Sequence, residues 1–195
     1  MDWTSQKIIL ASQSPRRQEI LEMVGLKFTV QKSEYEEDRI IDKTPMELVE
    51  THAIEKAKDV ATTKKQGLVI GSDTIVVIDH EILEKPQNKS HAFDMLKKLS
   101  GRTHEVQTGV AVINAVNSKT LSFVEITEVT FFPLSDDMIN HYLKNYEYAD
   151  KAGSYAIQDY SGLFVEKIHG CFYNVVGFPV ARFFNFLNKN QHKLL

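Results

Sequence analysis

The sequence predicts an α/β fold in which helices flank a mixed β-sheet. Stretches with strand-like patterns alternate with stretches of helical periodicity along the 195 residues, as in proteins whose helices cover a sheet. Two long β-rich runs, 104–116 and 119–132, are separated only by Asn117-Ser118. So short a connection does not allow a crossover, which predicts an antiparallel hairpin and therefore a mixed sheet.

Capping residues and apolar patterns set the expected elements of the first half of the chain. Ser14 suits a helix N-cap and Pro15 suits the first helical turn, because proline has no backbone N–H to leave unpaired. Thr44, Pro45 and Glu47 form a capping box with proline at the first helical position. In chain order, we expect a buried strand at 8–11, a helix from Pro15 to about Gly25, a half-exposed strand at 27–31, an acidic loop at 33–38, a helix from Pro45 to about Lys65, an apolar strand or strand pair at 68–78 and a helix capped by Ser90 and ended by Gly101.

The second half of the chain continues with the hairpin and further helices. Ser135 is a suitable N-cap, and Asp136 and Asp137 behind it suit the positive end of a helix. After the hairpin, we expect a helix from Ser135 to about Asn145, an irregular loop at 150–158, a strand at 163–168 and a closing helix at 180–187. We find no repeat, low-complexity segment or linker, which predicts a single domain over residues 1–195.

Composition and charge narrow the classes of function. The net charge of −3 provides no basic field for non-specific binding to nucleic acid or anionic lipid, so we expect neither as a partner. The apolar run near the N-terminus is too short for a signal peptide, and no stretch approaches the roughly 18 apolar residues of a membrane span. The single cysteine, Cys171, excludes an intramolecular disulfide and fits a reducing compartment. A cytoplasmic location is expected.

The segment Ser14-Pro15-Arg16-Arg17 contains a conflict at the expected helix start. The first turn of a helix carries partial positive charge, so the adjacent cations Arg16 and Arg17 are unfavourable there. A bound anion reverses the sign of that effect, and guanidinium groups match phosphate oxygens in pairs. This pattern indicates a phosphate site. The alternative is that both arginines simply lie in solvent.

Carboxylates elsewhere in the chain are candidates for catalysis and metal binding. Asp73 lies within an apolar strand, where a carboxylate is costly unless it is paired, hydrogen-bonded or bound to a metal. Gly71 allows another backbone or a ligand to approach closely. Glu36 and Glu37 are candidates to join Asp73 around Mg²⁺, which takes one or two carboxylates and completes its shell with water and phosphates. The alternatives are a strand-end aspartate that faces water and an acidic loop that is only solvated.

Two lysines are candidate phosphate ligands, and other chemistries lack support. Lys56 lies on the expected long helix and Lys85 precedes Pro86, although either residue alone is more often a surface lysine. The seven histidines show no metal-ligand spacing, and no paired cysteines are present. Neither a glycine-rich nucleotide loop nor a nucleophile motif occurs. The remaining cations and carboxylates suit a metal-bound polyphosphate.

Six motifs in order resemble those of the Maf family of nucleoside triphosphate pyrophosphatases, and more closely its dTTP/UTP branch. The resemblance extends from Ile8 to about Pro179. The motifs are Leu10-Ala11-Ser12-Gln13-Ser14-Pro15-Arg16-Arg17, Glu55-Lys56-Ala57, Gly71-Ser72-Asp73-Thr74, Glu84-Lys85-Pro86, Leu99-Ser100-Gly101-Arg102-Thr103-His104 and Asp150-Lys151-Ala152-Gly153-Ser154-Tyr155-Ala156-Ile157-Gln158.

The resemblance implies a fold, a reaction and roles for individual residues. The implied fold is an α/β domain with two lobes around a cleft, similar to the inosine triphosphate pyrophosphatases. The implied reaction cleaves a nucleoside triphosphate, dTTP or UTP, into the monophosphate and pyrophosphate with a divalent cation, Mg or Mn. The implied roles are Asp73 as the proton acceptor that activates water, Glu37 and Asp73 as metal ligands, Ser14, Arg16, Arg17, Lys56 and Lys85 as phosphate ligands, and Arg16, Thr74 and Gln158 as base-selecting residues.

The chain departs from the family pattern after Gln158, and two further points stay open. Asp159-Tyr160-Ser161-Gly162 occupies a position where members often have glycine-rich sequence, which bears on how the base pocket closes. Gly170-Cys171-Phe172 likewise replaces a more polar turn. The alternative function is a nucleotide-binding regulator of cell division, an inhibitor of septum formation with little turnover. The sequence leaves the oligomeric state open, with a homodimer among the possible states.

Overall fold

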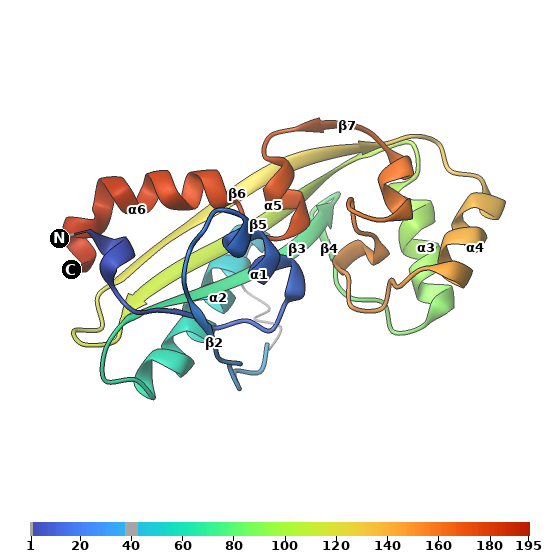
Figure 1. Ribbon diagram of the computed structural model, residues 1–195. Coiled ribbons are helices and arrows are strands. Elements are labelled where there is room, and N and C mark those ends of the chain that lie inside the picture. The colour runs from blue at the N-terminus through green and yellow to red at the C-terminus, as the bar shows by residue number, and fades with distance from the viewer. Residues whose placement is uncertain (1, 38–42) are drawn as a thin grey trace. The chain divides into compact units, whose positions relative to one another are not determined.

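The computed structural model describes residues 2–37 and 43–195 and divides into two compact units (Figure 1). The first unit comprises Met1–Asp73, Thr108–Glu125 and Gly177–Leu195, and the second comprises Thr74–Gln107 and Ile126–Val176. Three strands, β3 (Leu68–Ile78), β5 (Thr103–Asn114) and β6 (Thr120–Phe131), contribute residues to both units. The cleft between two lobes stays a prediction.

Within the described residues, seven strands form one mixed sheet with the order β2-β1-β3-β5-β6-β7, and β4 pairs with β3. The other strands are β1 (Ile8–Leu10), β2 (Thr29–Val30), β4 (Glu81–Leu83) and β7 (Val165–His169). Strand β1 pairs in parallel with β2 and β3, whereas the β3–β4 and β6–β7 pairs are antiparallel. The helices are α1 (Pro15–Met23), α2 (Pro45–Thr62), α3 (Lys89–Leu99), α4 (Asp136–Asn145), α5 (Phe172–Val176) and α6 (Val180–Leu194), with 3₁₀ helices at Trp3–Ser5, Ala152–Ser154 and Tyr160–Phe164. The predicted α/β class with a mixed sheet is confirmed.

Most elements begin and end close to their predicted positions because local capping sets them. The capping box of α2 forms as expected, with Thr44 Oγ1 accepting from the Glu47 backbone N–H and the Glu47 carboxylate accepting from Thr44 N–H. Ser135 caps α4 through the Met138 N–H. The β5 and β6 runs are neighbours in the sheet, as the hairpin requires. Residues 68–78 form one continuous strand and not a strand pair.

Several local predictions are wrong. Asn88, and not Ser90, caps α3, because its side-chain oxygen accepts from the His91 N–H at 2.9 Å. Residues Tyr160–Phe164 form a 3₁₀ helix, so the strand predicted at 163–168 begins only at Val165. The strand predicted at 27–31 shrinks to β2, and both of its residues are exposed. The last residue of the predicted acidic loop, Asp38, lies outside the described residues.

In the first unit, helix α2 packs directly against the backbone of two neighbouring strands at glycines. A Cβ atom at Gly71 on β3 would lie 2.1 Å from the Ala53 carbonyl oxygen, and one at Gly109 on β5 would lie 2.3 Å from the Val49 carbonyl oxygen. Any side chain at either position would clash with the α2 backbone, so both glycines allow the helix to pack closely on the sheet. The apolar face of α2, which includes Ala57, completes a core with Ile9. Close packing at Gly71 fixes the distance of α2 from β3.

The close approach at Gly71 predicts a large effect of adding one methyl group. Gly71→Ala is expected to lower the free energy of unfolding by about 3 kcal/mol, because the nearest atoms are backbone atoms that cannot rotate away. Urea denaturation measures this change. The control is Gly25→Ala, where φ is 75° but no atom lies within 4 Å of the added Cβ. Its expected cost is about 1 kcal/mol, and an equal cost at the two positions would contradict the packing argument.

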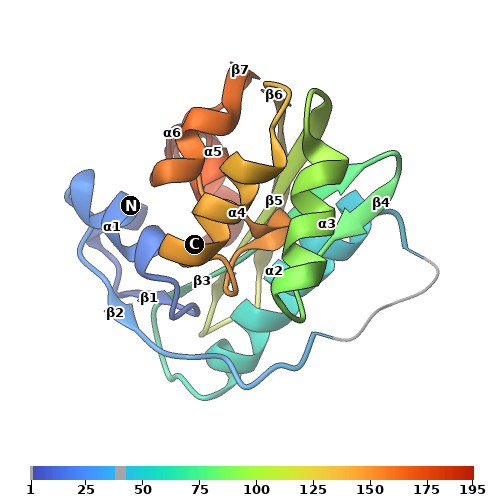
Figure 2. The same cartoon turned by 90° about the vertical axis from the view of Figure 1, so that its right-hand side faces the viewer.

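The second unit has its own apolar core, in which His104 and Tyr155 form a buried polar pair. Helices α3 and α4 lie side by side on this unit (Figure 2). The Nε2 atom of His104 is 2.8 Å from the Tyr155 hydroxyl oxygen, and both rings make edge contacts with Phe131. Burial lowers the pKa of His104 to about 3 and raises the pKa of the Tyr155 hydroxyl. Both groups are therefore neutral in the folded protein at ordinary pH.

The buried neutral imidazole predicts a stability loss in acid. The unfolded chain binds a proton at His104 near pH 6.5, whereas the folded protein binds it only near pH 3. Between these values the unfolded state holds more protons, so the free energy of unfolding falls by about 1.4 kcal/mol per pH unit as the pH decreases. His104→Gln, which keeps a polar group for Tyr155, is expected to remove this slope from urea unfolding measured between pH 6.5 and 4.5. The exposed His192→Gln is the control and should keep the slope.

Candidate functional site

The centre of the candidate site is the carboxylate of Asp73 on β3. The residue is 7% exposed, and its Oδ1 atom accepts a hydrogen bond of 2.8 Å from the Lys56 ammonium. Gly71 and Asp73 are two positions apart on the strand and therefore lie on the same face of the sheet, which is the face that α2 covers. The close packing of α2 at Gly71 thus places Lys56 within reach of Asp73.

Lys56 bridges Asp73 to a second carboxylate. Its Nζ atom lies 2.5 Å from Glu37 Oε1, and the side chains of Lys56 and Glu37 are 13% and 48% exposed. Two carboxylates therefore converge on one cationic nitrogen, one from the sheet and one from the segment after β2. Three of the predicted site residues, Glu37, Lys56 and Asp73, therefore lie together in the first unit.

Asp73 is held in its ionised form. Burial alone raises the pKa of its carboxyl group, but the charge and hydrogen bond of Lys56, together with Arg17 and His52, outweigh burial and lower the pKa below its usual range. Asp73 is therefore a carboxylate at neutral pH. A buried, charged group of this kind in an apolar strand is typical of a functional site.

Arg17 lies in the first turn of α1 and is partly buried with fixed partners. Its Nε donates to the Gly177 carbonyl oxygen at 3.0 Å, and its Nη1 donates to Ser12 Oγ at 3.1 Å. Burial lowers the pKa of the guanidinium, whereas the charges of Asp73 and Glu37 raise it, so Arg17 shares the electrostatic environment of both carboxylates. The interpretation of Arg17 as a freely solvated surface arginine is wrong.

The start of α1 departs from one detail of the prediction. Ser14 occupies the N-cap position, but its side chain makes no capping hydrogen bond. The Oγ atom of Ser12 instead accepts from the Ser14 N–H at 3.2 Å, in addition to the bond from Arg17. Ser12 therefore organises this turn. Arg16 lies near enough to Arg17 for its charge to lower the Arg17 pKa.

Three predicted site residues, Thr74, Lys85 and Gln158, belong to the second unit. Thr74 follows Asp73 on β3 and is partly buried, while Lys85 and Gln158 are exposed. The Gly153 N–H donates to the Glu84 carbonyl at 3.2 Å, so the loop that leads to Gln158 lies beside the segment that carries Lys85. Their grouping with Asp73 and the arginines stays a prediction.

Side chains after Gln158 close the loop that carries it. The buried Ser161 hydroxyl contacts the Asp159 carboxylate at 2.6 Å and the Ala156 carbonyl at 2.8 Å, and it accepts from the Ala156 N–H. Tyr160 stacks on Tyr146 with ring centroids 4.9 Å apart. The residues that replace the glycine-rich sequence of the family, 159–162, therefore hold the loop in place through their side chains.

Sequence reasoning missed Ser12, His52, Gly177 and Tyr35. His52 lies four residues before Lys56, a spacing that places both residues on one face of α2. This spacing is the sequence feature that could have indicated His52 as a site residue. His52 is 5% exposed, and its Nδ1 atom is 3.1 Å from the Tyr35 hydroxyl. Gly177 contributes a backbone carbonyl from 160 residues away, which no local pattern indicates.

The two carboxylates beside Lys56, those of Glu37 and Asp73, fit a divalent cation whose other ligands come from a bound phosphate group and water. No cluster of three or more His, Cys, Asp or Glu side chains suited to a metal occurs among residues 2–37 and 43–195. Glu37 and Asp73 nevertheless converge on one cation, the Lys56 ammonium. Mg²⁺ and similar ions take one or two protein carboxylates and use substrate phosphates and water for the rest. The site therefore suits an ion that binds together with a polyphosphate.

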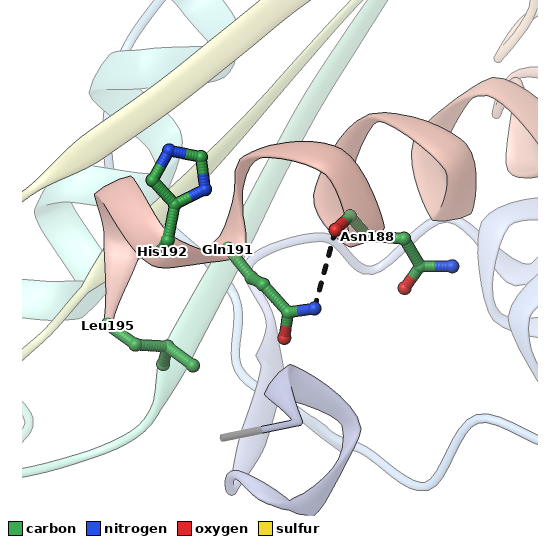
Figure 3. Close-up of a pocket in the computed structure, with 4 residues that line it drawn as sticks. All are labelled: Asn188, Gln191, His192 and Leu195. Carbon is green, nitrogen blue, oxygen red and sulfur yellow. Dashed lines mark hydrogen bonds between the residues drawn. The ribbon is translucent and has the colours of Figure 1, made fainter.

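A surface pocket lies elsewhere in the first unit, at the C-terminal end of α6 (Figure 3). Its lining residues are Asn188, Gln191, His192 and Leu195. The side chains of Asn188 and Gln191 accept hydrogen bonds from the side chain and the backbone of Trp3, at 2.8 and 3.1 Å. Two of the polar side chains of this pocket, Asn188 and Gln191, therefore hold the N-terminal segment. In the part of the chain that the structure describes, no helix is long and apolar enough to cross a membrane.

A family model and curated relatives match nearly the whole chain. A family model described as Maf-like protein matches residues 7–190. A dTTP/UTP pyrophosphatase of Carboxydothermus hydrogenoformans is 45% identical over 183 residues, which cover 94% of this chain and 98% of the relative. A protein of the same name from Clostridioides difficile is 47% identical, with 93% and 94% covered. The Ham1 protein of Staphylococcus aureus matches 65% of this chain and 72% of its own with a TM-score of 0.47 and 13% identity.

Proposed function

This chain belongs to the Maf family, and we propose that it hydrolyses dTTP and UTP to the nucleoside monophosphate and pyrophosphate. Relatives that are 45% and 47% identical over nearly the whole chain carry the name of this activity. The observation that carries the proposal is the buried Asp73 carboxylate, which Lys56 keeps ionised beside a second carboxylate and Arg17. The relatives are named for turnover, which favours an enzyme over a regulator with little activity.

In the proposed mechanism, Asp73 accepts a proton from the water that attacks the α-phosphorus. Asp73 is ionised at neutral pH and can therefore accept a proton, and the Lys56 ammonium holds its Oδ1 atom at 2.8 Å. Arg17 binds phosphate oxygens from a position fixed by Ser12 and Gly177, so little conformational entropy is lost on binding. Arg16, Lys56, Lys85 and Ser14 complete the proposed phosphate ligands.

Glu37 and Asp73 are the proposed ligands of a divalent cation, Mg or Mn. Such an ion neutralises charge on the triphosphate and on the departing pyrophosphate. Lys56 contacts both carboxylates, so its ammonium offsets their mutual repulsion before an ion binds. Glu37 and Asp73 would hold the ion, and the Lys56 ammonium beside them would supply a second positive charge for the phosphate groups.

Arg16, Thr74 and Gln158 are the proposed base-selecting residues. The amide of Gln158 can donate and accept at the same time, which matches the adjacent carbonyl and N–H groups of uracil and thymine. Ser161 holds the backbone of the loop at Ala156, two residues before Gln158. A cytoplasmic location and a homodimer stay predictions.

A nucleotide panel tests the proposed function. The purified protein is incubated with UTP, dTTP, CTP, ATP and GTP in the presence of Mg²⁺, and pyrophosphate and nucleotide products are measured. UMP or dTMP with stoichiometric pyrophosphate is expected, and EDTA should abolish both. Binding without product would favour the regulator, whereas release of orthophosphate with a diphosphate would show cleavage at the wrong bond.

A further inference from the structure

One face of α2 holds the segment that carries Glu37. His52, Lys56 and Asp59 are spaced by four and three residues, so their side chains lie on one face of the helix. Each of them contacts residues within 33–37, at the three alternate positions Ser33, Tyr35 and Glu37. The position of Glu37 therefore depends on more than its own ion pair with Lys56.

Asp59 makes the polar contacts at the start of this segment. Its Oδ2 atom accepts from Ser33 Oγ at 2.9 Å and from the Glu34 N–H at 2.8 Å. Ser33 Oγ in turn accepts from the Tyr35 N–H at 3.1 Å. One carboxylate thus satisfies, directly or through Ser33, two consecutive backbone N–H groups just before Glu37. Hydrogen bonds to an ionised acceptor are stronger than those between neutral groups.

The Tyr35 side chain supplies the second contact of the segment with the helix. Its hydroxyl lies 3.1 Å from Nδ1 of the buried His52, and the two rings lie 5.8 Å apart. Loss of Asp59 would remove the acceptor of both the Ser33 hydroxyl and the Glu34 N–H, and the Glu37 carboxylate that follows them is 48% exposed. Ordering Glu37 would then cost backbone entropy each time an ion binds.

We infer that Asp59 is a positioning residue, which fixes the segment 33–37 on α2 so that Glu37 is held ready as a metal ligand. This inference rests on the proposed function for the role of Glu37. Asp59 does not touch the ion or the substrate in this scheme. Loss of residues that orient metal ligands typically weakens metal binding by about 10- to 100-fold.

The test compares Asp59→Ala with a charge-matched control. Alanine is the most favourable helix residue, so the variant should keep α2 folded. Mn²⁺ affinity is measured by electron paramagnetic resonance in the presence of α,β-methylene-UTP, which is not cleaved between its α and β phosphates. Asp59→Ala should weaken Mn²⁺ binding about 10-fold, and Asp59→Asn, which keeps an acceptor oxygen, should restore most of it.

The control is Glu55→Ala, which removes an acid from the same helix. Glu55 pairs with the exposed Lys58 at 3.3 Å and takes no part in the hydrogen bonds of Asp59 with the segment. Its loss changes the net charge by the same amount as the loss of Asp59. Equal weakening by Glu55→Ala would overturn the positioning role, because charge alone would explain the effect. Unchanged Mn²⁺ affinity of Asp59→Ala would overturn it as well.

Amide hydrogen exchange tests the contact independently of metal and nucleotide. In the free protein, the Glu34 and Tyr35 amides should exchange faster in Asp59→Ala than in the wild type. The Glu34 N–H loses its acceptor, and the Tyr35 N–H donates to a Ser33 hydroxyl that is no longer held by Asp59. Unchanged exchange would overturn the inference even if the protein hydrolyses UTP. The converse outcome is that the protein releases no pyrophosphate while Asp59→Ala still speeds the exchange of these amides. That result would support the contact of Asp59 with the segment and contradict the proposed function.

Discussion

Asp73→Asn is expected to lower the turnover number for UTP by about 10²- to 10⁴-fold, the usual range for loss of a general base. Asparagine has nearly the same shape as aspartate but cannot accept the proton from water. Lys56 keeps its contact with Glu37, and Arg17 keeps Ser12 and Gly177, so nucleotide binding should survive. Steady-state kinetics and binding of α,β-methylene-UTP separate the two quantities.

The matched control for this variant is Asp94→Asn. Asp94 is an exposed acid on α3, where the same isosteric change should leave turnover within about two-fold, as for most surface substitutions. Near-normal turnover of Asp73→Asn would remove Asp73 from the role of base. A parallel loss of nucleotide binding would instead indicate that Asp73 acts mainly through the metal and the phosphates.

Local signals predicted the elements well because the groups that end a helix or turn a chain are neighbours in sequence. The capping box at Thr44 and the cap at Ser135 are of this kind. Where two polar residues compete, the sequence does not decide, and Asn88 replaces Ser90 as the cap of α3. The short helix α5 was not predicted, because five residues are too few for a helical period to be visible.

The sequence predicts those residues of the candidate site whose charges are unfavourable at their expected positions. Asp73 conflicts with its apolar strand and Arg17 conflicts with the helix start, and the structure resolves both conflicts in one region. The partners that resolve them are distant in sequence. Ser12 and Gly177 bind Arg17, and Asp59 holds the segment before Glu37, through contacts that only the folded chain creates.

Lys56→Met is expected to lower the free energy of unfolding by about 3 kcal/mol, the low end for removing one partner of a buried ion pair. Methionine fills a similar volume without the charge, so the change isolates the ion pair from packing. Asp73 would be left at 7% exposure without its 2.8 Å partner. Urea denaturation at pH 7 measures the loss, and UTP turnover should fall as well.

The control for Lys56→Met lies two residues further along the same helix. Lys58 pairs with Glu55 at 3.3 Å, but the two side chains are 61% and 36% exposed. Exposed pairs of this kind contribute little, so Lys58→Met should change the free energy of unfolding by less than about 0.5 kcal/mol. If the two variants were equally stable, the Lys56–Asp73 pair would not be a buried ion pair in solution.

A double-mutant cycle identifies which carboxylate Lys56 chiefly compensates. In Lys56→Met/Asp73→Asn the unpaired Asp73 carboxylate is removed, so the double variant should be more stable than Lys56→Met alone, with a coupling energy of about 2 kcal/mol. In Lys56→Met/Glu37→Gln little should be regained, because the Glu37 side chain is 48% exposed and water already screens its charge. Recovery by Glu37→Gln instead of Asp73→Asn would reverse the assignment and make Glu37 the carboxylate that depends on Lys56.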